Sequence, residues 1–191
     1  MKRRKAIGTL LLAGGAVAAG FAGYEWFTLT KTPDREYLLS RSPLLIDLAE
    51  AILPATDTPG AREAGAVNYM MRLLNDCTDT PTLNRFIEGL RDLETYTLYH
   101  FHHPFSECLE SEKQSVLAHF EQQAHSDHPV LEKVEKKIIG KPFFTTLKSY
   151  SVQGYCISEK GASLGMRYLA VPGQYLSCIP LEPNQKAWAT K

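Results

Sequence analysis

Apolar residues recur at three- and four-residue steps along most of the chain, a pattern that predicts amphipathic helices. The clearest repeat runs from Thr82 to Phe101, and charged residues occupy its other face. Further helices are predicted over 42–53, 62–76, 111–124 (with Ser111 as N-cap), about 131–138, and from Pro142 onward. No stretch shows the two-residue alternation of a strand. The pattern therefore predicts an all-α domain of about five to six helices.

The stretch 142–180 is rich in aromatic residues and glycine, and it is the part of the chain that the helical repeat explains least. Phe143 and Phe144 open it at helical spacing, but the repeat fades after Gly154. Turn residues then alternate with tyrosines, which combine a large apolar surface with a polar tip. We expect an irregular, aromatic-rich C-terminal tail. It either wraps its own domain or forms a surface for a partner.

The N-terminus has the composition of an export signal. Arg3 and Arg4 lie in a basic cluster, and residues 6–24 carry no charge. The arginine pair predicts a twin-arginine signal, which directs folded proteins to the export machinery. The uncharged run is also close to the roughly 20 residues that span a bilayer, so 1–24 is either a cleaved signal or a retained anchor helix. Residues 25–41 are predicted to be a linker, and 42–191 the domain; either reading places that domain outside the cytoplasm.

Net charge and cysteine content indicate which partners and which cysteine chemistry to expect. The chain has 21 basic and 21 acidic residues, so nucleic acid is not expected as a partner. The four cysteines show none of the clustering of a zinc site. In an oxidising compartment an even number of cysteines indicates disulfides, and three pairings are open to Cys77, Cys108, Cys156 and Cys178.

Candidate catalytic chemistry is sparse. His100 and His103 would share a helix face and, with Glu107, could bind a metal; histidines near a helix end also interact favourably with the helix dipole. The sequence contains no G-x-S-x-G, no G-x-G-x-x-G after a strand, and no C-x-x-C-H haem motif. We therefore assign no catalytic, cofactor-binding or metal residue. An accessory subunit is favoured over a membrane-anchored structural protein, and over a metal-dependent envelope enzyme using His100 and His103.

Several segments in order resemble the gluconate 2-dehydrogenase subunit 3 family. The resemblance covers roughly 42–190 and rests on Ile52 to Ala61 with Glu63-Ala64-Gly65, Phe143-Phe144 with Leu147-Lys148, Gly154-Tyr155 with Ser158, Glu159 and Gly161, Pro172-Gly173, Cys178 with Pro180-Leu181, and Lys186 to Ala189. One departure is Cys156, where the family often has an aromatic residue. This cysteine could pair with Cys178 or remain a free thiol.

The resemblance implies a non-catalytic small subunit in the periplasm, associated with the membrane. Its partners would be a large FAD-dependent dehydrogenase of the glucose–methanol–choline type and, in some complexes, a multihaem cytochrome c. The partner would cross the membrane with this chain through the twin-arginine translocase. The tail would then supply the interface, with Cys178 free to bridge to another subunit or within the chain. The expected contact residues are Tyr155, Tyr168, Tyr175 and Trp188.

Overall fold

The computed structural model describes residues 23, 30–124, 140–171, 173–174 and 178–189. Within these ranges the chain is mostly helical and forms no strand, which confirms the all-α prediction. The described α-helices are α2 (Arg35–Ser40), α3 (Ser42–Ile52), α4 (Ala61–Ala64), α5 (Ala66–Arg72), α6 (Thr80–Phe101), α7 (Glu110–Ala124) and α9 (Phe143–Ile157). Three short turns of helix, η1 (Leu73–Cys77), η2 (Phe105–Glu107) and η3 (Gly161–Gly165), complete the described elements.

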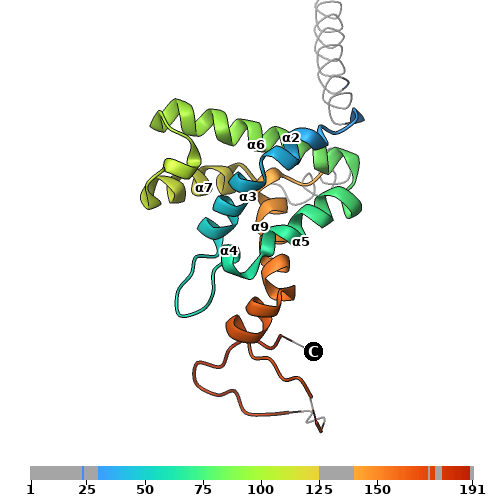
Figure 1. Cartoon of the computed structure of the whole chain (residues 1–191), viewed down its shortest axis with the longest axis vertical. Coiled ribbons are helices and arrows are strands. Elements are labelled where there is room, and N and C mark those ends of the chain that lie inside the picture. Colours follow the sequence, from blue (N-terminus) through green and yellow to red (C-terminus); the bar gives the residue numbers. More distant parts are fainter. Residues whose placement is uncertain (1–22, 24–29, 125–139, 172, 175–177, 190–191) are drawn as a thin grey trace, which may run out of the picture.

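Helix α9 lies at the centre of the domain, and the other helices pack around it (Figure 1). Helices α3, α4, α5, α6 and α7 all contact α9, and the contact with α5 is the most extensive. The first half of α9 buries Phe143, Phe144 and Leu147 in the core. The Phe143 ring lies 5.2 Å from the Phe86 ring of α6 and 5.7 Å from the Phe120 ring of α7, measured between centroids. This aromatic cluster joins the three longest helices.

Two glycines permit close approach to α9. Gly154 of α9 faces the backbone of α5 so closely that a Cβ there would lie 2.3 Å from the carbonyl oxygen of Ala66. At the other end of α9, a Cβ on Gly89 of α6 would lie 2.4 Å from the side chain of Phe143. The absence of a side chain at these positions therefore sets the separation of the helices.

The predicted boundaries needed three corrections. The helix predicted over 62–76 is divided into α4 and α5 by Gly65, whose left-handed backbone (φ 68°) ends one helix and begins the next. Helix α7 begins before Ser111, because the Glu112 carboxylate accepts a hydrogen bond from the backbone N–H of Leu109 at 2.7 Å. The end of the predicted linker 25–41 is helix α2, which buries Leu38 completely.

Some predictions concern residues outside the described ranges. The predicted helix over 131–138 lies there, and so does the predicted signal or anchor over 1–24, with Arg3 and Arg4, apart from Gly23. Among the helices that are described, none combines the length and the apolar character required to cross a bilayer.

Candidate functional site

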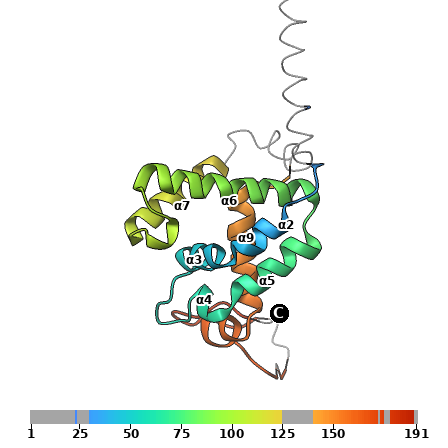
Figure 2. The same cartoon turned by 45° about the horizontal axis from the view of Figure 1, so that its top comes forward.

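The described part of the C-terminal segment, residues 158–171, 173–174 and 178–189, leaves the end of α9 and extends away from α6 (Figures 1 and 2). The Ser158 hydroxyl stabilises the turn that follows α9. It donates to the carbonyl of Tyr155 at 2.7 Å and accepts from the N–H of Gly161 at 3.0 Å. Turn η3 then folds onto Tyr155, whose hydroxyl would lie 2.2 Å from a Cβ on Gly165. Tyr155, predicted as a contact residue, is therefore half-buried within its own chain.

The two ends of the tail are held together by a backbone bridge. The N–H of Arg167 donates to the carbonyl of Ala187 at 2.8 Å, and the N–H of Ala189 donates to the carbonyl of Arg167 at 2.9 Å. The Arg167 guanidinium also lies 4.4 Å from the centre of the Trp188 ring. The bridge therefore holds Arg167 beside residues 187–189, which are far from it in the sequence. Trp188, another predicted contact residue, remains 37% exposed at this bridge.

The tail exposes large apolar side chains that the domain does not cover. Val171 is 78% exposed and Leu181 is 83% exposed, and the predicted contact residue Tyr168 is 52% exposed. Single exposed apolar residues are ordinary, whereas contiguous patches of them are typical of interaction surfaces. We call this set the tail surface; it consists of Ile157, Leu164, Tyr168, Leu169, Val171, Ile179, Leu181 and Trp188. Tyr175 lies outside the described residues.

The four cysteines are all free thiols in the structure. Cys77 and Cys178 are exposed, Cys156 is half-buried and Cys108 is buried. The structure therefore contains no disulfide among these cysteines, and none of the three internal pairings is formed. A bridge from exposed Cys178 to another subunit stays a prediction.

The histidines near the end of α6 are arranged differently from the predicted metal site. The His100 ring packs beside Tyr96 with centroids 4.2 Å apart, and within the described residues neither His100 nor Glu107 joins a group of metal-binding donors. His103 instead lies near Cys108 and Glu112: its Nδ1 is 3.5 Å from Sγ, and its Nε2 is 3.6 Å from Oε2. Sequence analysis missed this group, because its members are five and four residues apart across a corner and not on one helix face.

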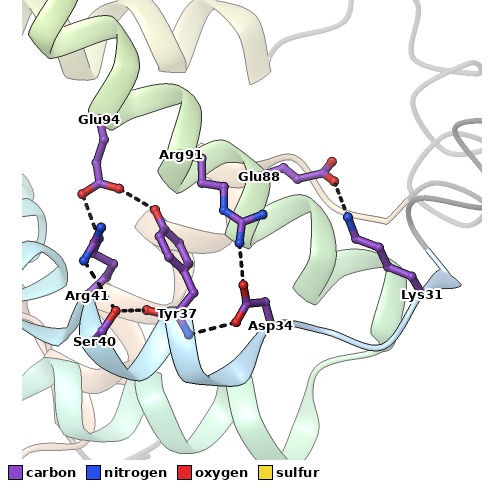
Figure 3. A network of polar contacts seen from close by, with 8 residues as sticks. All are labelled: Lys31, Asp34, Tyr37, Ser40, Arg41, Glu88, Arg91 and Glu94. Carbon is purple, nitrogen blue, oxygen red and sulfur yellow. Dashed lines mark hydrogen bonds and ion pairs between the residues drawn. The ribbon is translucent and has the colours of Figure 1, made fainter.

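A polar clasp between α2 and α6 fixes the residues that follow the N-terminal segment (Figure 3). The Tyr37 hydroxyl donates to Glu94 at 2.5 Å, and the same carboxylate pairs with Arg41 at 2.8 Å. Arg91 of α6 pairs with Asp34 at 2.6 Å, and Lys31 and Glu88 form a further ion pair at 3.5 Å. Exposed ion pairs contribute little individually. Together with buried Leu38, they hold the start of the domain against its longest helix.

Burial, with the hydrogen bond to Glu94, raises the pKa of Tyr37 from 10.0 to about 12. The folded protein therefore holds this proton more tightly than the unfolded chain. Its contribution to stability is complete below pH 10 and is lost as the pH rises through 12.

We expect the free energy of unfolding to decrease less steeply between pH 10 and 12 in Tyr37→Phe than in the wild type. Denaturant titrations at several pH values measure this slope, and Tyr99→Phe, at an exposed position of α6, should retain the wild-type slope.

Comparisons with known proteins identify the family of the chain. No curated protein and no solved structure matches the chain. The family model described as gluconate 2-dehydrogenase subunit 3 matches residues 40–173, which is more than half of the chain and includes every helix from α3 to α9. The family is one of small subunits of a dehydrogenase complex. The chain belongs to the gluconate 2-dehydrogenase subunit 3 family.

Proposed function

We propose that this chain is the non-catalytic small subunit of a periplasmic, membrane-associated dehydrogenase. Its partner is a large FAD-dependent subunit of the glucose–methanol–choline type that oxidises a sugar, a sugar acid or an alcohol. The small subunit assists maturation of this partner and carries it, already folded, through the twin-arginine route. Membership of the family supports the association with dehydrogenase subunits.

The observation that carries the proposal is the tail surface. The segment that carries most of it extends beyond the helical domain (Figure 1), and the described part of the chain leaves its apolar side chains exposed. Burying such side chains in a complex removes apolar area from water at roughly 25 cal/mol per Å². Exposed aromatic and aliphatic residues of this kind form the central, desolvated part of interfaces. The tail surface therefore provides a docking site for the large subunit.

The clasp supports the export part of the proposal. Transport of a folded complex requires that the signal remain attached to a domain that stays folded. The residues directly after the predicted signal and linker start are tied to α6 through Lys31, Asp34, Tyr37 and Arg41. A partner docked on the tail surface would then be linked to the signal by the helical domain and would cross the membrane with it.

The redox groups of the complex belong to its partners. FAD supplies the oxidation of the substrate in the large subunit, and haem c, where a cytochrome is present, accepts the electrons. This chain contributes binding and positioning, since its sequence has neither the haem motif C-x-x-C-H nor a strand followed by G-x-G-x-x-G.

Export is tested by replacing Arg3 and Arg4 together with lysine. We expect the flavoprotein partner to accumulate in the cytoplasm, because the translocase recognises the arginine pair and the partner depends on this signal. The measurement is the distribution of flavin-linked dehydrogenase activity between cytoplasm and envelope. Replacing Lys2 and Lys5 with arginine preserves the charge and should leave export intact. Wild-type envelope activity in the Lys-Lys variant would contradict the proposal.

A further inference from the structure

The corner between α6 and α7 brings three different metal-binding side chains together. We propose that His103, Cys108 and Glu112 bind one divalent cation of the zinc type. This inference is independent of the proposed function, because it uses none of the residues of the tail surface or of the signal. The expected ligands are one thiolate, one imidazole and one carboxylate, with water in the fourth position.

The distances agree with such a site. The three donor atoms lie within 4.8 Å of one another, and the closest pair, Cys108 Sγ and His103 Nδ1, is separated by 3.5 Å. Zinc binds sulfur at about 2.3 Å and imidazole nitrogen at about 2.0 Å, so tetrahedral coordination separates these two atoms by roughly 3.5 Å. The Glu112 carboxylate is the third donor of the group, with its Oε2 3.6 Å from the His103 ring at Nε2.

The fold of the corner holds the donors in place before any cation binds. His102 ends α6 in the left-handed conformation, with φ 63°, and turns the chain toward η2. The Cys108 thiol is buried at the end of η2 and approaches the carbonyl of Pro104 at 3.6 Å. The hydrogen bond from the Leu109 N–H holds the Glu112 carboxylate at the start of α7. Each ligand is thus positioned by a different local element.

The same residues fit a metal better than they fit nucleophilic catalysis. The Cys108 N–H is already bonded to the carbonyl of Phe105 at 3.2 Å and cannot stabilise an oxyanion. Sulfur, nitrogen and oxygen donors together suit zinc. The side chains of His103 and Glu112 are 31% and 24% exposed, which leaves an entry path.

The consequence for the molecule is a cross-link between two of the helices that surround α9. A cation at this corner joins the end of α6 to the start of α7 and would oppose fraying there. Structural zinc sites act in this way by stabilising the folded arrangement of their ligands.

The test uses the full chain purified in mild detergent, together with any partner that accompanies it, after removal of metal with a chelator. Zinc is titrated against a coloured competing chelator. We expect one equivalent to bind, and to bind more than about 100-fold more weakly in His103→Gln and Cys108→Ser, since even outer-sphere partners of zinc cost 10- to 100-fold. The matched controls His100→Gln and Cys77→Ser should bind like the wild type. Cobalt should give tetrahedral visible bands with a thiolate charge-transfer band, and Cys108→Ser should lack the latter.

Glu112→Gln separates the loss of a metal ligand from a loss of folding. Glutamine lacks the carboxylate but can still accept the hydrogen bond from Leu109. Circular dichroism in chelator should show the wild-type helix content for this variant, with weakened zinc binding. The proposal is overturned if the wild type binds no zinc at micromolar concentrations. It is equally overturned if zinc affinity is unchanged in Glu112→Gln and Cys108→Ser, or is lost in Cys77→Ser.

Discussion

Gly154→Ala is expected to lower the free energy of unfolding by about 1–2 kcal/mol. The added methyl group would lie 2.3 Å from the carbonyl oxygen of Ala66, far inside van der Waals contact. Because the obstacle is the backbone of α5, no change of rotamer can relieve it, and the helices must separate. Overpacking of this kind costs about 1–3 kcal/mol and sometimes more. The better helix propensity of alanine offsets only about 1 kcal/mol of this loss in stability.

Equilibrium denaturation followed by circular dichroism measures this loss. Gln153→Ala is the matched control, because it places alanine at an exposed neighbouring position of the same helix and should change stability by less than about 0.5 kcal/mol. A Gly154→Ala variant as stable as the wild type would show that α5 and α9 are not in close backbone contact. The position of α9 as the central helix would then need revision.

Placing aspartate at both Val171 and Leu181 is expected to weaken association with the large subunit by at least about 30-fold, since removing a central interface side chain costs about 2 kcal/mol or more. These are the two most exposed apolar residues of the tail surface, at 78% and 83%. In the free chain the new carboxylates remain in water, so folding should be unaffected. In the complex they would be buried against apolar groups, which is costly for an unpaired charge.

Tyr99→Asp is the control for this variant. Tyr99 is 76% exposed, but it belongs to α6, which lies away from the tail in both overall views (Figures 1 and 2). Co-purification of tagged chains, with circular dichroism to confirm folding, compares the two. If the tail variant retains its partner and Tyr99→Asp loses it, the binding surface lies on α6. If neither loses it, the tail surface is not the interface.

The regular part of the fold could be predicted because its signal is local. Helix α6 has a long apolar repeat, and its observed limits, Thr80–Phe101, differ from the predicted ones only at the start, where Asp79 accepts a hydrogen bond from the Thr82 N–H. Helix α2 lacks such a repeat. It is six residues long and is held by one buried leucine and by partners on α6, so no periodicity reveals it.

The functional groups were harder to predict because they depend on tertiary contacts. Tyr155 is half-buried because η3 packs against it at Gly161 and Gly165, and its contact with a partner stays a prediction. The group His103, Cys108 and Glu112 forms only because the chain turns at His102 and runs through η2. A helical spacing rule pairs His103 with His100 instead. A cysteine five residues after a histidine carries no signal until the corner between them is known.

The central claim, that this chain is the small subunit of a flavin dehydrogenase, is tested most directly by purifying it with a C-terminal tag from its native membranes in mild detergent. The account predicts a large co-purifying protein with the absorbance bands of a flavin. A colourless single band would contradict it and would favour a structural protein of the envelope.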